Sequence, residues 1–277
     1  MFLRIIIPSI LAVFLALNVR SQFSDNSDII EKFSFETVQI EEFIERFNFN
    51  NDTKLLKYLK NNYPEFDINR KDFLFTLFNN TDTTNNKSLI KSFINNVCDS
   101  INPKFLNFYA NNWFADANCI FKYDNKSDTG NIILKLQVYP DSSVKWVIES
   151  INTNILTFPW KRDSLHFISP VSHGANFISL TNTFKDGKGV LNYLPNNFKP
   201  DRMTFIATLM YLNKIKVDKV YNVKYHFLQI PGWTFTVDYY NRKELQSGWL
   251  ISNLFKMTTH EKYKYKKDLL NIDNPQL

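Results

Sequence analysis

The side chains best suited to acid–base chemistry lie where predicted strands begin or pair. His226 and Asp238 fall on adjacent strands of one predicted hairpin, whose turn is residues 230–233. Tyr109 and Asp116 lie where a strand of the first half begins. A carboxylate base and a tyrosine in an apolar pocket would suit an isomerase or dehydratase. A cross-strand polar pair on a solvated sheet face would have the same spacing, so both interpretations stay open.

No catalytic motif accompanies these residues. The sequence holds no Gly-x-Ser-x-Gly elbow and no complete phosphate-binding loop. The four histidines form no His-Glu-x-x-His pattern, and two cysteines are too few for a four-thiolate metal site. We therefore assign no catalytic residue, no metal site and no cofactor, and an enzyme is the less favoured of the function classes.

Aromatic side chains at loop positions favour a binding function. Trp160 lies in a proline-containing connector, and Trp233 follows Pro-Gly at the predicted hairpin tip. From such positions an indole ring can stack on a ligand or enter a partner's pocket. His173 lies in a Ser-His-Gly turn of the same connector, where it could instead shape the turn. We expect Trp160, His173 and Trp233 to border a ligand-binding groove at a domain junction.

The first residues have the layout of a secretory signal peptide. A basic start precedes an apolar run, Ile5–Val19, and small or β-branched residues precede a cut after Ser21. The run is shorter than the roughly 20 residues of a spanning helix, so we expect no integral membrane span in the mature chain. An uncleaved N-terminal anchor is the alternative. Export to the periplasm or cell surface makes a disulfide between Cys98 and Cys119 chemically available, with two separate buried thiols as the alternative.

Composition and charge narrow the partners. Of the 277 residues 44% are hydrophobic and 22% charged, as in folded proteins. The net charge of +6 falls to about +4 without residues 1–21, too mild to indicate nucleic-acid binding. The expected partner is a small molecule, a glycan or an envelope protein. Asparagine is about one residue in eight, which is typical of an AT-rich coding sequence, so we give the asparagines little functional weight.

Periodicity divides the chain into two similar halves. Helical spacing gives way to strand alternation, with a turn expected at 124–130 and a strand at 131–139, and the same order returns after a connector. The segment 67–77 is echoed by 201–209, and 145–148 by 248–251, which favours an internal duplication. The expected divisions are a signal peptide (1–21), a flexible lead-in (22–36), a first α+β domain (37–152), a connector (153–175), a second, shorter α+β domain (176–258) and a basic C-terminal tail (259–277).

Helices followed by a curved antiparallel sheet that ends in a tryptophan-bearing strand resemble the nuclear-transport-factor-2-like (NTF2-like, cystatin-like, cone-shaped) superfamily. The chain is also similar to uncharacterised exported proteins of the Bacteroidetes. That similarity lies in residues 43–48, 70–73, 145–148, 226–230, 235–237, 241–242 and 247–252. The resemblance implies two tandem α+β units. The superfamily includes isomerases, dehydratases and binding modules, so it does not select a function. We expect an exported, non-catalytic binding module of the cell envelope, with an isomerase-type or dehydratase-type enzyme as the alternative.

Overall fold

The computed structural model describes residues 36–64, 67–80, 86–155, 180–183, 190–195, 197, 201–242 and 247–272. The signal peptide predicted for 1–21, the lead-in up to residue 35 and most of the connector lie outside these residues, so those assignments stay predictions. Trp160 and His173 also lie outside them. No helix within the described residues is long and apolar enough to cross a membrane.

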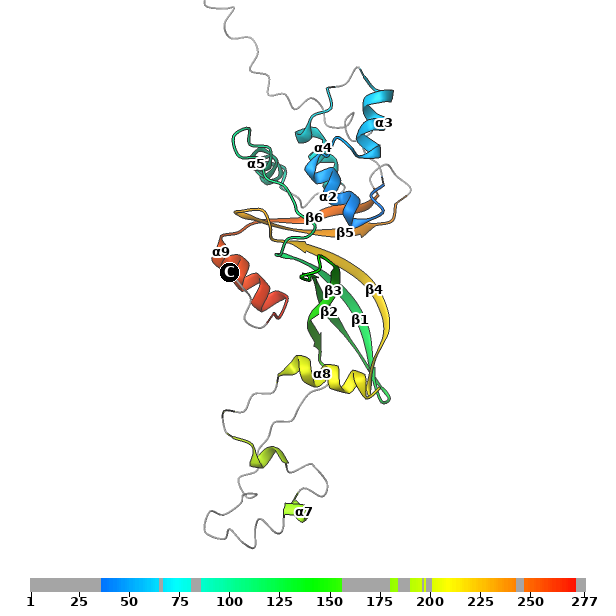
Figure 1. The fold of residues 1–277 in the computed structure, drawn as a ribbon, viewed down its shortest axis with the longest axis vertical. Helices are drawn as coiled ribbons and strands as arrows, with labels where there is room; N and C mark the ends of the chain where they lie inside the picture. Colours follow the sequence, from blue (N-terminus) through cyan, green and yellow to red (C-terminus); the bar gives the residue numbers. More distant parts are fainter. Residues whose placement is uncertain are drawn as a thin grey trace, which may run out of the picture. The chain divides into compact units, whose positions relative to one another are not determined.

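The fold is α+β, with one six-stranded antiparallel sheet (Figure 1). The strand order is β3-β2-β1-β4-β5-β6. The first strands of the two halves, β1 and β4, are therefore neighbours in the sheet. Apart from the start of β2, the strands begin and end close to where side-chain alternation predicts them. The strands are β1 (Trp113–Tyr123), β2 (Lys126–Val138), β3 (Val144–Thr153), β4 (Ile215–Phe227), β5 (Trp233–Tyr240) and β6 (Gly248–Lys256).

Packing divides the chain into two units, and the division differs from the expected one. Unit 1 contains residues up to 108 together with 235–255, and unit 2 contains 109–234 together with 256–277. Sequence periodicity predicts domains that are continuous segments of the chain. In the structure each unit instead combines two segments that are separated in the sequence. The helices of the first half pack with strands of the second half, and the later helix α8 packs with β1 and β3 of the first half and with β4 of its own half.

Unit 1 has a core of phenylalanine rings. The ring of Phe235 on β5 stacks on Phe47 at 5.7 Å and meets Phe93 edge-on, also at 5.7 Å between centroids. Phe43 completes the cluster, 6.4 Å from Phe235. The apolar positions recur at helical spacing, which is why these helices bury one face against the strands. The helices are α2 (Ile40–Asn48), α3 (Lys54–Asn62), α4 (Arg70–Thr76) and α5 (Lys87–Val97).

Arg70 ties the ends of these helices together. Its Nε and Nη2 donate to the carbonyl of Phe47 at 3.3 Å, and Nη1 donates to that of Val97 at 3.2 Å. Nη2 also donates to the carbonyl of Lys104 at 2.5 Å, and the guanidinium lies over the Phe105 ring at 4.3 Å. Phe47 and Val97 are in the last turns of α2 and α5, where carbonyls lack helical partners. One side chain therefore closes two helix ends.

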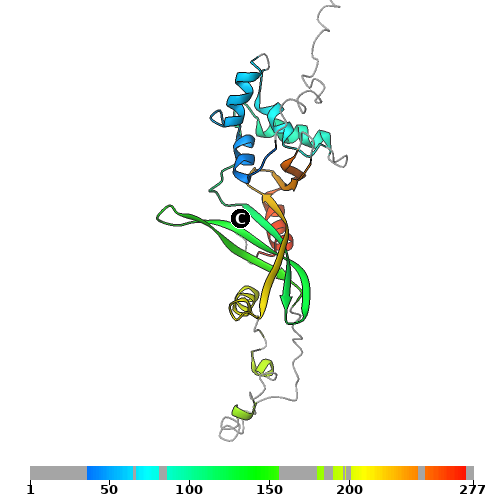
Figure 2. The ribbon, with the colours of Figure 1, turned by 90° about the vertical axis from the view of Figure 1, so that its right-hand side faces the viewer.

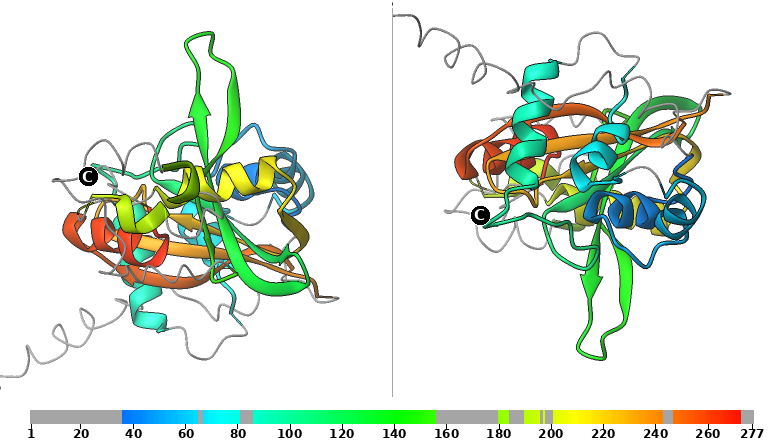
Figure 3. Two further views of the ribbon diagram at one scale, coloured as in Figure 1. Left: turned by 90° about the horizontal axis from the view of Figure 1, so that it is seen from below. Right: turned by 90° about the horizontal axis from the view of Figure 1, so that it is seen from above.

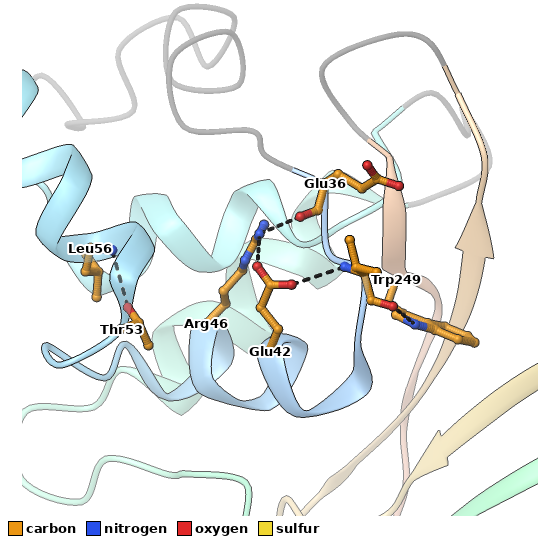
Figure 4. Close-up of polar contacts among 7 residues, drawn as sticks. Glu36, Glu42, Arg46, Thr53, Leu56 and Trp249 are labelled. Carbon is orange, nitrogen blue, oxygen red and sulfur yellow. Dashed lines mark hydrogen bonds and ion pairs between the residues drawn. The ribbon is translucent and has the colours of Figure 1, made fainter.

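The segment before α2 is fastened to β6 (Figure 4). The indole Nε1 of Trp249 donates to the carbonyl of Val38 at 3.1 Å, and the Val38 amide donates to Glu42 Oε2 at 3.1 Å. Glu42 also pairs with Arg46, whose Nη2 donates to the carbonyl of Glu36 at 2.6 Å. These bonds connect the first described residues to the helix and to the strand of the same unit.

Unit 2 contains the strands β1 to β4 with a helical element on each face. Helix α8 (Arg202–Tyr211) packs near the β1–β2 turn, on the face of Cys119 and Phe121 (Figures 1 and 3). Phe114 lies on the other face because side chains alternate along a strand. That face is covered by α9 (Thr259–Lys264) and the π-helical turn η2 (Tyr265–Leu269), as Figure 2 shows. The short elements α7 (Leu180–Thr183) and η1 (Val190–Tyr193) precede α8.

Two local predictions need correction. Residues 259–272 are not simply a basic tail, because Leu270 and Ile272 are buried against the sheet. The abundant lysines of this segment make it look solvent-exposed from sequence alone, although Leu270 and Ile272 pack against the sheet. Strand β2 also begins at Lys126 rather than at residue 131, because the turn after β1 is only two residues long. Asp124 in that turn has a φ of 49°, a conformation that Asp tolerates better than most residues.

Candidate functional site

The sequence-predicted residues are distributed over both units. Asp116 and His226 lie together in unit 2, whereas Asp238 belongs to unit 1. Tyr109 is exposed and precedes β1. Trp233 is only 4% exposed, so its indole has no open face for stacking on a ligand. It begins β5, and its amide donates to the carbonyl of Ile230 across the turn, which carries the ring inward.

The two cysteines are free thiols. Cys98 is the half-buried C-cap of α5 in unit 1, and Cys119 is fully buried on β1 in unit 2. The Cys119 thiol donates to the carbonyl of Ala117 at 3.1 Å. The structure therefore has the two separate thiols and not the disulfide. Burial raises the pKa of both thiols, which keeps them protonated and unreactive.

A buried polar cluster joins β1, β4 and the C-terminal turn. His226 is 3% exposed, and its Nδ1 lies 2.7 Å from the hydroxyl of Tyr265. Its Nε2 lies 3.4 Å from Asp116 Oδ2, and the amide of Asn131 donates to Asp116 Oδ1 at 2.8 Å. Strand register explains the proximity, because Phe114 lies opposite His226 and Asp116 is two residues further on the same face.

The surroundings of the cluster disfavour ionised side chains on the C-terminal segment. Burial, followed by the charge of Asp116, raises the pKa of Tyr265 far above its usual value. Burial, followed by the charge of Lys266, lowers the pKa of Lys262 to about 8. Lys262 donates to the carbonyls of Leu228 and Ile230 at 2.7 and 2.6 Å, which fastens α9 beside the end of β4. The tyrosine hydroxyl thus stays a neutral hydrogen-bonding group.

A small hollow lies on the same face but does not reach the cluster. Its volume is about 200 Å³, and Phe114, Lys135, Glu149 and Lys266 are among its lining residues. His226, Tyr265 and Asp116 line neither this hollow nor the two larger hollows at the edge of the sheet, whereas Asn131 lines one of the larger two. A substrate bound in any of these hollows would not touch His226. The cluster has the chemistry of an acid–base pair, but its position is that of a structural network.

The most distinctive polar feature of unit 2 is a row of asparagines across four adjacent strands. Asn118 on β1 is paired with Asn131 on β2 and with Asn222 on β4. Asn131 is in turn paired with Asn152 on β3. Residues paired in this way carry their side chains on one face of the sheet. We call Asn222, Asn118, Asn131 and Asn152 the amide row.

Three members of the amide row line an open groove at the edge of the sheet. The groove consists of two hollows of about 590 and 400 Å³, which share Asn152, Arg202 and Asn271. Both volumes fall within the range of about 300–1,000 Å³ that is common for ligand sites. Asn118 and Asn131 line the smaller hollow, whereas Asn222 lines neither. We call this combined site the amide groove.

The groove holds polar groups that the protein itself does not satisfy. The Nδ2 of Asn152 is buried and has no hydrogen-bond partner. A buried donor without a partner costs about 1–3 kcal/mol, and such a cost is commonly retained where a ligand or water completes the bond. Arg202 uses Nη2 to donate to the carbonyl of Thr153 at 2.5 Å, which holds the start of α8 against β3. The remaining guanidinium donors are available to the groove.

The end of the C-terminal turn forms the remaining wall. Asn271 follows η2 with a φ of 50°, the left-handed conformation that often ends a helix. The amide of Ile272 donates back to the carbonyl of Lys266 at 3.1 Å, so the chain reverses and Ile272 enters the core. Ser150 Oγ donates to the carbonyl of Leu270 at 2.9 Å and fixes this turn to β3. The reversal places Asn271 in both hollows.

Two acidic residues around the groove are already bonded within the protein. Glu149 forms an ion pair with Lys135 at 2.7 Å. Asp201 caps α8, and its hydrogen bonds with the Thr204 side chain, the Thr204 amide and the Met203 amide hold its pKa below the usual range. The groups left for a ligand are therefore the neutral amides together with Arg202, Lys267 and Asp268. Among the described residues, no set of three His, Cys, Asp or Glu side chains is placed to hold a metal ion.

The amide row is the feature that sequence reasoning missed. Its members are far apart in the chain, and we assigned the abundant asparagines to composition. One signal was present: a two-residue turn at 124–125 pairs Tyr123 with Lys126 and brings Asn118 opposite Asn131. Placing the turn over 124–130 hides this register.

Comparison with known proteins assigns no function to the site, which is therefore interpreted from its geometry. No protein-family model, no curated protein and no solved structure matches the chain.

Proposed function

We propose that this chain is an exported, non-catalytic binding module of the cell envelope, and that its ligand occupies the amide groove. The observation that carries the proposal is the amide row, whose member Asn152 has a buried Nδ2 without a partner at the groove. Amides bind ligands by hydrogen bonding and are poor acids, bases and nucleophiles at neutral pH. A groove of this composition is suited to recognition more than to reaction.

Two tandem NTF2-like units are part of the proposal, and the topology supports a duplication. With the strands of each half numbered one to three, the order β3-β2-β1-β4-β5-β6 reads the same from both ends. The echoed segments contain α4 and α8, which both begin after a capping side chain, Asn69 and Asp201. Unit 1 combines helices of the first half with β5 and β6, and unit 2 combines helices of the second half with β1 to β3 and with β4, as a duplicated chain with partly exchanged elements would.

Ligand-dependent thermal unfolding of the full-length chain tests the binding function. The panel contains neutral oligosaccharides, inorganic phosphate, short peptides, sterols and divalent metal ions. A ligand at 100 times its dissociation constant stabilises the folded state by about 2.7 kcal/mol, which shifts the midpoint by roughly 5–10 °C for a domain of this size. We expect one class to shift the wild type but not the Asn118→Leu/Asn152→Leu variant. A flat panel, or an equal shift in the variant, would overturn the groove as the binding site.

Export has its own test. The mass of the chain recovered from the periplasm or the cell surface should correspond to a protein that begins at Gln22. Recovery of the full mass from a membrane pellet would support the uncleaved anchor instead.

An isomerase-type or dehydratase-type enzyme is the second candidate, and the Asp116–His226 contact of 3.4 Å favours it. The test of this candidate measures whether the ligand is chemically changed. Each compound that shifts the midpoint is incubated with the chain and examined by NMR for new products. Turnover that disappears in His226→Phe would support the enzyme, and unchanged compounds would exclude it for those ligands.

A further inference from the structure

We infer that the amide groove recognises a neutral carbohydrate, with the asparagine side chains that line the groove bonding its hydroxyl groups and Tyr221 stacking on a sugar ring. The inference rests on the proposed binding function and adds the class of ligand.

The chemistry of the row matches that of sugar hydroxyls. An asparagine side chain presents one acceptor oxygen and two donor hydrogens, and a hydroxyl group likewise both donates and accepts. Asn118, Asn152 and Asn271 bring three such groups to one groove, and Arg202 adds further donors. Neighbouring hydroxyls of a sugar ring need several groups of this kind at close spacing. The strands supply that spacing, because adjacent strands lie about 4.8 Å apart.

The charges of the groove disfavour an ionic ligand. Arg202 and Lys267 are accompanied by Glu149, Asp201 and Asp268, so cations and anions are mixed along the lining. Glu149 and Asp201 are already bonded within the protein. A phosphate or nucleotide site concentrates cationic side chains or free backbone amides on one anion. This groove instead spreads neutral amide dipoles over three strands and a turn.

A β-bulge places an aromatic ring beside the amides. The pairing of β1 with β4 shifts between Asn118 and Cys119, which leaves Tyr221 as an extra residue next to Asn222. Bulges re-aim side chains and are common next to functional sites. Tyr221 lines the smaller hollow and remains 52% exposed. A ring in this position offers an apolar surface to the C–H face of a sugar, while the amides meet its hydroxyls.

Composition alone does not explain the row. With about one asparagine in eight residues, a given row of four positions would be all asparagine about once in four thousand cases. Asparagine is also disfavoured within strands, so its presence on four adjacent strands runs against local preference. A function in ligand recognition accounts for both the residue type and the alignment.

Isothermal titration of the full-length chain with defined neutral oligosaccharides tests the inference. The probes are glucan, mannan and xylan oligomers of two to six sugars, titrated into wild type and variants. Asn118→Leu/Asn152→Leu removes two groove amides, and Asn222→Leu is the matched control from the same row outside the groove. Tyr221→Ala removes the ring, Tyr221→Phe keeps it, and Tyr211→Ala alters an exposed tyrosine of α8.

We expect one oligomer class to bind, with affinity at least tenfold weaker in the double asparagine variant and about tenfold weaker in Tyr221→Ala. Asn222→Leu, Tyr221→Phe and Tyr211→Ala should bind as the wild type does. Binding of inorganic phosphate or of an extended peptide, but of no neutral sugar, with loss in the double variant would overturn the carbohydrate and leave the binding function intact. Sugar binding that no groove variant weakens would overturn both.

Discussion

The two units of this chain use their polar side chains in different ways. In unit 1 the guanidinium of Arg70 donates to the carbonyls of Phe47, Val97 and Lys104. Aromatic rings fill the space around it. In unit 2 the Nδ2 of Asn152 is buried without a partner, beside an open groove. Both units combine helices with strands of the same sheet.

The difference shows what each unit is suited to do. A core in which the rings of Phe43, Phe47, Phe93 and Phe235 touch one another gains free energy from every contact and presents no polar group to a ligand. Unit 2 divides its apolar residues into one cluster on each face of the sheet. That arrangement leaves the edge at β3 free for polar side chains. We therefore expect the largest losses of stability from changes in unit 1, whereas the proposed recognition site lies in unit 2.

The largest expected effect is the loss of the central ring of unit 1. Phe235→Ala should lower the free energy of unfolding by about 3–5 kcal/mol, because it leaves a cavity among packed rings. Urea unfolding of the full-length chain measures the change. Phe255→Ala, at a partly exposed position of the same unit, is the control and should cost less than about 1 kcal/mol. Equal losses in the two variants would mean that the phenylalanine cluster is not the main core.

Substitution of one arginine in each unit allows a direct comparison of their contributions to the free energy of unfolding. Arg70→Met should cost about 2–4 kcal/mol, because half-buried carbonyls at two helix ends lose a charged donor. Arg202→Met removes the bond to the Thr153 carbonyl from an exposed side chain and should cost less than about 1 kcal/mol. The unfolding midpoints in urea give both values. A reversed order would contradict the expectation that the larger losses of stability arise in unit 1.

The sequence predicts the helices and strands of the two units better than it predicts how those helices and strands pack together. Helices and strands follow from local periodicity, and Asp201 is recognisable as a helix cap from its residue type and position alone. The pairing of β1 with β4 joins residues about a hundred positions apart, and no local pattern specifies it. The division into units and most of the amide row depend on that pairing and on the bulge at Tyr221. Asp116 and His226 are identifiable by residue type, but their contact is a consequence of the same register.

The C-terminal segment of unit 2 should respond to alkaline pH. Lys262 has a pKa of about 8 in the folded chain against about 10.4 when unfolded, so the unfolded state binds more protons between these values. Its contribution to stability therefore rises with pH through this window, by about 1 kcal/mol after allowance for its partial exposure.

Comparison with Lys262→Met isolates this contribution. The buried thiols and Tyr265 have raised pKa values, so they oppose the rise above pH 9 in both proteins. Urea unfolding at pH 7.5, 8.5 and 9.5 should show the stability of the wild type increasing relative to that of the variant. A constant difference across these pH values would mean that the ammonium group is equally well accommodated in both states.

The smallest effect has the opposite sign and bears most directly on the difference between the units. Asn152→Leu removes a buried donor that lacks a partner, so unfolding should become harder by about 0.5–1 kcal/mol. Asn131→Leu, in the same row, should lower stability by about 1 kcal/mol instead, because it breaks the 2.8 Å bond to Asp116. Thermal unfolding of the two variants without added ligand distinguishes these outcomes.

If Asn152→Leu is destabilising, its amide has a structural partner such as bound water, and the groove loses the unsatisfied group on which recognition depends. If it stabilises the free chain and also abolishes ligand binding, the unit retains that amide at the expense of its own stability, which is the signature of a site kept for recognition.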